Sequence, residues 1–331
     1  MSVSGKWVLV VLSTLLCVGS SSPPLWRRLP RGVAPPLVPT DNPMTRTKIE
    51  LGHRLFYDAD LSIDGTMSCA TCHEQKHAFA DGNRTHQGVR GDPGLRNVPG
   101  LANVAWLERL TWADPRLTSL ERQAAVPIHG DDPVEMGMKG HEAEISKRLS
   151  HNDCYVRMFK MAFPKEGGSI NLVTVSKALA AFERTLLSFE SPYDRYRRTG
   201  RTISEIAKRG EHVFRRDCAN CHSGVNFTDG AYHLLQSSAS DTSDRGLARV
   251  TGLAADDGRF RTPSLRNVAL TGPYLHDGSA PTIDEAISRH AISLTANDRK
   301  AVVAFLDQLT DRSFTTDPSF ALPPTSCASD T

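Results

Sequence analysis

Two five-residue motifs carry the side chains best suited to chemistry in this chain. Cysteine, two further residues, cysteine and histidine occur at 69–73 and again at 218–222. In this pattern, two thiols can bond to the vinyl groups of a haem while the adjacent histidine binds its iron. Zinc or a thioredoxin-like redox pair is the alternative, but zinc knuckles usually lie roughly 15–20 residues apart, these motifs lie most of a domain apart, and a histidine directly follows each cysteine pair. We therefore predict two covalently bound haem c groups, held by Cys69, Cys72, His73, Cys218, Cys221 and His222.

The segments that follow the two motifs are related to each other. Pro99–Ala105 recurs as Pro263–Ala269, and Ser119–Ala124 corresponds to Thr282–Ile287. A repeat of this kind indicates that both halves share one structural plan. The chain is therefore predicted to be a tandem of two related, cytochrome c-like haem domains.

The repeat also exposes a difference between the halves. When Leu120 is aligned with Ile283, the position seven residues further on holds Pro127 in the first half and His290 in the second. Proline has no side-chain atom that binds iron, whereas histidine is a strong ligand. We expect His290 to complete the coordination of the second haem and the first haem to stay open. Two other side chains are rival ligands of the second haem: Tyr274 and His276.

An open haem can react with small molecules, and three residues near the first repeat suit peroxide as the substrate. Glu135 could move a proton between the two peroxide oxygens, and Gln123 could hold the bound oxygen by a hydrogen bond. Trp112 offers an oxidisable ring if it lies between the haems. Each also has an ordinary structural role, because a tryptophan is often core and a glutamate can cap a helix. The asymmetry of the two haems nevertheless favours an enzyme.

The remaining pattern is mainly helical. Apolar residues at three- and four-residue spacing predict helices over Thr45–Tyr57, Glu142–Phe163 and Leu172–Phe189, and no long alternating strand pattern competes with them. The Ser191-Pro192 pair marks the domain junction. It precedes a basic stretch, Arg195–Arg201, that could dock an anionic partner or a haem propionate, or simply be solvated. We predict haem domains at 44–195 and 196–312, with a tail at 313–331.

The N-terminus indicates export. Residues 1–22 combine Lys6, a short apolar run and small residues, as in a secretory signal peptide, and the run is short for a membrane span of ~20 residues. A membrane anchor is the alternative. Residues 23–43 contain seven prolines and are expected to form a poorly ordered leader. In the periplasm, Cys154 and Cys327 could form a disulfide with each other, or be free or intermolecular thiols. The net charge of +2 argues against nucleic-acid binding.

From about residue 44 to 310, the sequence resembles the bacterial di-haem cytochrome c peroxidase and MauG family. Besides the two haem motifs, the resemblance rests on Leu51–Tyr57, Phe79–Gly82, Pro133–Gly137, Ala178–Thr185 and Arg261–Tyr274. It implies that Gln123 and Glu135 line a peroxide pocket, that Trp112 lies between the haems and that His290 ligates the second haem. It further implies a calcium ion between the domains, bound by the Asn97 side chain and the carbonyls of Thr271 and Pro273.

Three further comparisons with members of that family refine the expectation. Family members often carry methionine or tyrosine where this chain has His290. The loop histidine that blocks the first haem of reductively activated peroxidases corresponds to Val89 here, with His86 the nearest histidine, which favours a permanently open first haem. The Trp112–Pro115 run resembles an MbnH-like branch that oxidises a tryptophan in a partner protein.

Three functions follow from these observations. The first is peroxide reduction with electrons from a small cytochrome or copper protein. The second is oxidation of a tryptophan in a specific partner protein. The third, from another class, is a plain electron-transfer cytochrome in which both irons are six-coordinate.

Overall fold

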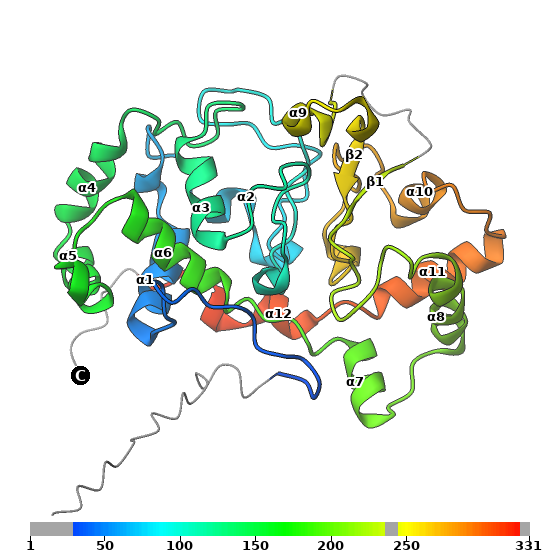
Figure 1. Cartoon of the computed structure of the whole chain (residues 1–331). Coiled ribbons are helices and arrows are strands. Elements are labelled where there is room, and N and C mark those ends of the chain that lie inside the picture. The colour runs from blue at the N-terminus through cyan, green and yellow to red at the C-terminus, as the bar shows by residue number, and fades with distance from the viewer. Residues whose placement is uncertain (1–28, 236–243, 325–331) are drawn as a thin grey trace, which may run out of the picture.

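The computed structural model describes residues 29–235 and 244–324 and shows a mainly helical protein with two lobes (Figure 1). The expected signal peptide at 1–22 and Cys327 lie outside these residues. The first lobe contains α1 (Arg46–Phe56), α2 (Cys69–Cys72), α3 (Leu120–His129), α4 (Glu142–Ser150), α5 (Asp153–Ala162) and α6 (Leu172–Glu183). The second contains α7 (Pro192–Thr199), α8 (Glu205–Asp217), α9 (Ala248–Thr251), α10 (Ile283–Ser288) and α11 (Ala296–Asp307), and α12 (Arg312–Thr316) follows it. The predicted mainly helical fold class is confirmed.

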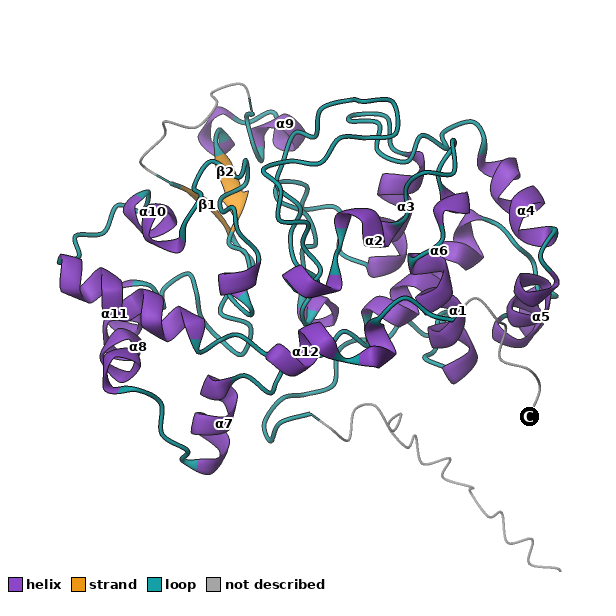
Figure 2. Cartoon of the chain, turned by 180° about the vertical axis from the view of Figure 1, so that it is seen from behind, coloured by secondary structure: helices purple, strands orange, loops and turns teal. Residues whose placement is uncertain are grey.

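The described strands are β1 (Tyr232–Leu234) and β2 (Arg259–Arg261) of the second lobe. They form one antiparallel pair, drawn in orange in Figure 2, in which Tyr232 lies opposite Arg261. Within the described residues, no helix combines the length and the apolar character that a membrane span needs.

Each lobe is built on one close helix crossing. In the first lobe α1 packs on α6, and in the second α8 packs on α11. A Cβ atom at Gly52 would lie 1.9 Å from the carbonyl oxygen of Ala178, and one at Gly210 would lie 1.8 Å from that of Ala301. Only glycine therefore allows the two backbones to approach this closely. The two crossings therefore use glycine in the same way at corresponding places.

The predicted internal repeat is present in three dimensions. Asn103 and Asn267 both adopt left-handed backbone conformations, with φ of 55° and 58°. Their backbone N–H groups donate to Leu186 O and Leu309 O, respectively, at 2.8 and 3.1 Å. The two halves therefore place their PxLxNVA segments against the end of the second helix of each crossing in the same way.

The helices differ from the sequence prediction at their ends. The helix predicted over Thr45–Tyr57 is α1, but the stretch Glu142–Phe163 forms two helices, α4 and α5. Asn152 separates them, because its side chain accepts a hydrogen bond from the first turn of α5. The helix expected to reach Phe189 ends at Glu183. Cys154, at the start of α5, takes part in a disulfide.

Both ends of the described chain are attached to the first lobe. The proline-rich leader was expected to stay apart from the core, yet Asn42 is fully buried and its side-chain amide donates to Glu121 and to the Lys177 carbonyl. At the other end, Phe314 of α12 is buried in the first lobe's core, and Tyr57 donates to the Phe320 carbonyl at 2.6 Å. The segment that follows the second lobe thus closes over the first.

Two candidate haem sites and the junction between them

The first motif presents its ligands on a short helix. Cys69 and Cys72 are the ends of α2. His73 follows directly, and its Nδ1 lies 2.6 Å from the Phe79 carbonyl. This hydrogen bond occupies one ring nitrogen and leaves Nε2 for a metal, which is how proteins usually orient a ligating histidine.

The second motif repeats this arrangement. Cys218 caps the end of α8, and His222 Nδ1 lies 3.2 Å from the Phe227 carbonyl. Burial and the neighbouring His290 lower the pKa of His222 to about 4, which keeps its imidazole neutral and therefore able to bind a metal.

A cavity of about 430 Å³ opens above the second motif. The rings of His222 and His290 lie across it with centroids 6.3 Å apart. This spacing accommodates one metal atom between two imidazole nitrogens at roughly 2 Å each. His290 Nδ1 is 2.9 Å from the Ala286 carbonyl, so its Nε2 is the nitrogen left for a metal. The cavity, the thiols and the paired imidazoles fit a covalently bound haem.

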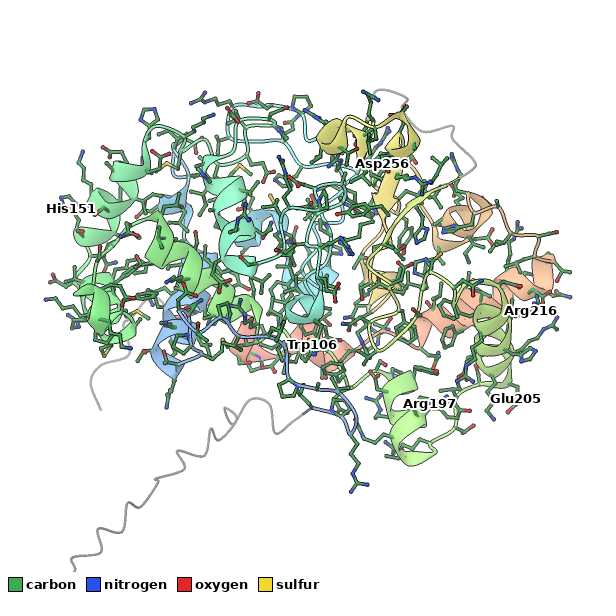
Figure 3. The ribbon with its side chains drawn as sticks, viewed as in Figure 1. Trp106, His151, Arg197, Glu205, Arg216 and Asp256 are labelled. Atoms are coloured by element: carbon green, nitrogen blue, oxygen red, sulfur yellow. The ribbon has the colours of Figure 1, made fainter. Side chains whose placement is uncertain are left out.

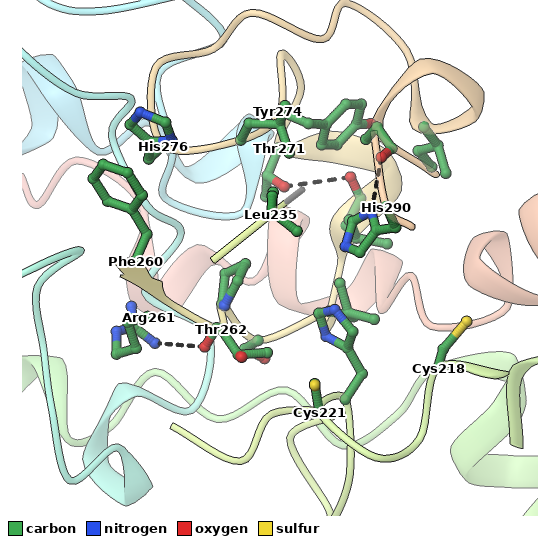
Figure 4. A pocket seen from close by; sticks show the side chains of 18 of the residues that line it. Cys218, Cys221, Leu235, Phe260, Arg261, Thr262, Thr271, Tyr274, His276 and His290 are labelled. Carbon is green, nitrogen blue, oxygen red and sulfur yellow. Dashed lines mark hydrogen bonds between the residues drawn. The ribbon is translucent and has the colours of Figure 1, made fainter. Parts of the chain in front are cut away.

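The rival ligands are arranged differently. Figure 4 shows His276 beside Phe260, on the opposite side of the cavity from Cys221 and His290. The His276 and Phe260 rings stack at 3.5 Å with an interplanar angle of 11°. Burial raises the pKa of Tyr274 to about 12, so its phenol stays protonated. Of the three candidates considered, His290 is the one whose ring faces His222.

The corresponding place in the first lobe holds no histidine. Pro127 lies in the last turn of α3, and its carbonyl accepts a hydrogen bond from Met136 N at 2.9 Å. Gln123 lies one turn earlier on α3, on the same face as Pro127. The chain segment containing Glu135 therefore runs beside the C-terminal end of α3.

A loop is fixed against Glu135. Val89 N donates to the Glu135 carbonyl at 2.8 Å, and a Cβ atom at Gly88 would lie 1.8 Å from the Val134 carbonyl oxygen. Burial raises the pKa of the Glu135 carboxyl, and the charge of His86 opposes this shift. His86 Nδ1 is itself 2.9 Å from a carboxylate oxygen of the buried Asp81. A carboxyl with a raised pKa is suited to proton transfer near neutral pH.

Trp112 lies at the junction of the lobes. It is 8% exposed, and its Nε1 donates to the Asn97 carbonyl at 2.7 Å. Its own carbonyl accepts a hydrogen bond from the backbone N–H of Arg261 in the second lobe, at 2.8 Å. Trp112 also lines the cavity above the second motif. The residue expected between the haems is therefore held from both sides.

The residues expected to bind calcium line the same cavity: Asn97, Thr271 and Pro273. The Asn97 side-chain amide donates to the carbonyls of Asn83 and Arg84, at 2.9 and 3.3 Å. This orientation uses the nitrogen and leaves the side-chain oxygen as the atom available to a cation.

Two buried charged residues were not singled out in the sequence. Glu183 is buried with one carboxylate oxygen that has no hydrogen-bond partner among the described residues, and burial raises its pKa to about 8. In the sequence, the sign of this buried carboxyl is that Glu183 is a single acidic residue at the end of the apolar run that forms α6. Arg261 is 3% exposed and lines the cavity; it lies two residues before the repeated segment Pro263–Ala269.

The basic stretch that follows Ser191 is α7, for which Ser191 is the N-cap. Figure 3 shows Arg197 on α7 at the outer edge of the second lobe. Arg197 lies 3.5 Å from Glu211, and Arg198 lies 2.7 Å from Glu190. These pairings favour the solvated-face interpretation of the stretch.

Fold and sites together define a di-haem c-type protein with unequal halves, and comparison with known proteins gives its family. Residues 46–202 match the family described as di-haem cytochrome c peroxidase, and residues 207–310 match cytochrome c. The chain is 36% identical over 290 residues to the methylamine utilization protein MauG of Methylorubrum extorquens, covering 82% of this chain and 80% of that protein. It is 32% identical over 283 residues to the cytochrome c551 peroxidase of Pseudomonas aeruginosa, covering 82% and 80%.

A solved structure agrees with these relatives. A MauG-like protein associated with microbial copper homeostasis superposes with a TM-score of 0.85 at 38% identity, covering 89% of this chain and 98% of that one. The chain therefore belongs to the di-haem cytochrome c peroxidase and MauG family. It is an oxidoreductase whose family carries two haem c groups.

Proposed function

We propose that this protein is a periplasmic enzyme that reduces hydrogen peroxide at the first site with two electrons drawn from a partner protein through the second. The balanced reaction consumes one peroxide, two electrons and two protons and yields two waters. The observation that carries the proposal is the inequality of the sites: His290 faces His222, whereas the corresponding position of the first lobe is Pro127. When bound, the haems supply the iron centres at which peroxide reacts and oxidising equivalents are stored.

The first site provides proton transfer. With a haem bound, Glu135 would accept a proton from one peroxide oxygen and deliver it to the other. The Gln123 amide holds the bound oxygen by a hydrogen bond. Val89 supports an accessible site, because a valine side chain has no atom that could ligate iron.

The second site and the junction provide electron transfer. His222 and His290 would hold the second haem, and Trp112 would provide the aromatic ring for electron transfer between the lobes. The hydrogen bonds from Trp112 Nε1 to Asn97 and from Arg261 N to Trp112 O fix the indole in place. A fixed aromatic ring reorganises little when it loses or gains an electron.

Two kinds of partner fit this enzyme. A small cytochrome or copper protein would make it a peroxide-detoxifying cytochrome c peroxidase. A tryptophan in a specific partner protein would make it a MauG-like protein-modifying enzyme. Val89 in place of a blocking histidine, and the similarity to a MauG-like structure, favour the second candidate.

Spectroscopy and one turnover experiment test the proposal. Electron paramagnetic resonance of the ferric holoprotein should show one high-spin and one low-spin haem. Two low-spin signals would refute the open first site and leave an electron carrier. Peroxide is then added with reduced cytochrome c, or with proteins encoded by neighbouring genes. Rapid oxidation of cytochrome c supports the peroxidase, and covalent oxidation of a partner tryptophan, seen by mass spectrometry, supports the MauG-like activity.

We also propose a calcium ion at the junction, bound by Asn97 and by the carbonyls of Thr271 and Pro273. Oxygen-only donors of this kind suit a hard cation. Within the described residues, no hydrogen bond reaches either carbonyl. Treatment of the holoprotein with a calcium chelator should lower its melting temperature and slow turnover, and added Ca²⁺ should restore both.

We propose further that residues 1–22 are a signal peptide. Mass spectrometry of the exported protein tests their removal.

A further inference from the structure

Among the described residues, three arginines are almost fully buried, and of these Arg261 is the one that has no carboxylate partner. The guanidinium groups of Arg184 and Arg266 each make two hydrogen bonds to one carboxylate, that of Glu121 and that of Asp194, respectively. Arg261 is buried to the same degree, but its side chain donates only to the carbonyls of Thr111 and Thr262, at 3.0 and 3.2 Å. A neutral carbonyl does not balance a buried positive charge, so burying this guanidinium is costly without an anion.

The cost is visible in the protonation of the group. Desolvation lowers the pKa of Arg261 to about 10, and the only neighbour that opposes this shift is Tyr232. No carboxylate of the described residues contributes. Among the described residues, the positive charge of Arg261 is therefore not balanced by a carboxylate.

A second polar group beside Arg261 also lacks a partner. Tyr232 lies directly opposite Arg261 in the β1–β2 pair, and side chains at directly opposed positions share one face of the sheet. The Tyr232 hydroxyl is buried and has no hydrogen-bond partner among the described residues. Among the described residues, one face of this small sheet therefore offers a guanidinium without a carboxylate partner and a hydroxyl without a hydrogen-bond partner.

The neighbouring cavity indicates which anion belongs there. Arg261 lines the same cavity as His222 and His290, and Figure 4 shows it at the edge beside Phe260 and Thr262. A haem placed between the two imidazoles carries carboxylates on its propionate side chains. A planar guanidinium matches a carboxylate with two parallel hydrogen bonds.

We propose that Arg261 is the carboxylate-binding residue of the second haem: it pairs with a propionate of that haem, and Tyr232 donates a further hydrogen bond to the same group. Because the backbone N–H of Arg261 donates to the Trp112 carbonyl and its Nε to the Thr111 carbonyl, the pair also ties the second haem to the Trp112 loop. The guanidinium charge favours the reduced form of the second haem. This inference rests on the proposed second haem site.

The test measures the ratio of ferrous to ferric second haem in the holoprotein at a fixed applied potential. Arg261→Gln removes a positive charge near the iron and should lower this ratio about tenfold, which for one electron is a shift of about 59 mV. Tyr232→Phe removes only a donor and should lower it by a smaller factor. Arg261→Lys retains the charge and should stay within about threefold of the wild type.

Arg184→Gln is the matched control, because Arg184 is equally buried, already has a carboxylate partner in Glu121 and does not line the cavity. It should reduce thermal stability and leave the ratio unchanged. Equal shifts in Arg261→Gln and Arg184→Gln, or no shift in Arg261→Gln, would overturn the proposal.

Two further measurements keep the result decisive. The low-spin signal of the second haem reports whether the proposed second haem site exists. If the wild type lacks this signal, the site itself is refuted. If the signal is present but Arg261→Gln leaves the ratio unchanged, only the role of Arg261 is refuted. If Arg261→Gln does not yield holoprotein, the wild type is titrated from pH 8 to 5. A paired propionate stays ionised and keeps the ratio constant. A ratio that climbs as the pH falls would reveal an unpaired propionate and contradict the proposal.

Discussion

At the scale of single residues, His290 has the strongest effect on the chemistry expected of the second site, since it occupies the place that Pro127 occupies in the first. We expect His290→Gly to convert the low-spin ferric second haem to high spin, because one imidazole ligand is lost. Electron paramagnetic resonance checks this, and added imidazole should restore the low-spin signal. His276→Ala is the control and should keep that signal, because His276 stacks on Phe260 instead. The reverse pattern would identify His276 as the ligand.

The role of Glu135 in proton transfer can be tested with a substitution that keeps the shape of its side chain. Glu135→Gln should slow peroxide reduction roughly 100-fold, because general acid–base groups typically contribute at least this much. Burial raises the pKa of Glu135, and its ionised form accepts the proton, so the wild-type rate should fall as the pH drops through that raised pKa. The variant should lack this step. Stopped-flow measurements that find the variant within threefold of the wild type would remove Glu135 from the mechanism.

The buried carboxyl of Glu183 should make the stability of the protein depend on pH. Its pKa is raised to about 8 in the folded protein and lies near 4.3 in an unfolded chain, so between these values the folded state holds a proton that the unfolded state has released. Stability from this group is therefore complete below about pH 4 and is lost as the pH rises toward 8. Glu183→Gln should be more stable than the wild type by ~1–3 kcal/mol at pH 9 and no more stable at pH 5. Urea unfolding at both pH values decides this, and an equal effect at both would contradict it.

At the scale of elements, the close crossing of α8 and α11 holds the second haem motif, because Cys218 follows α8 directly. Gly210→Ala places a methyl group where the Ala301 carbonyl lies, and the helices must separate. We expect a loss of about 2 kcal/mol, even though alanine favours helix by about 1 kcal/mol over glycine. Chemical denaturation of the holoprotein measures this loss. Lys208→Ala, on the exposed side of the same helix, should change stability by under ~0.5 kcal/mol. Equal stability of both variants would show that the crossing tolerates separation.

At the scale of the whole molecule, the chain after the second lobe completes the core of the first. Phe314 is 2% exposed, and its ring lies 5.5 Å from that of Phe79, whose carbonyl orients His73. Phe314→Ala should cost ~3–5 kcal/mol and broaden the spectrum of the first haem, although the residue lies more than two hundred positions from that haem's motif. Leu322→Ala, which is largely exposed, should do neither. A Phe314→Ala spectrum that changes only at the second haem would show that the lobes are not joined in this way.

The sequence by itself determined the parts of this protein that depend on covalent chemistry and short spacing. The two haem motifs, the helical fold class and the repeat follow from local patterns, and these patterns were sufficient to identify the asymmetry between Pro127 and His290. Helix ends were less predictable, because the cap at Asn152 competes with an apolar spacing that continues through it.

Only the tertiary structure decided which distant groups meet. The packing of α12 on the first lobe and the choice of His290 over His276 as the ring that faces His222 depend on contacts between segments far apart in the chain. The same holds for the burial of Arg261 away from any carboxylate of the described residues. A burial cost cannot be read from one position of a sequence, because it arises from the neighbours that exclude water and from the partner that is missing.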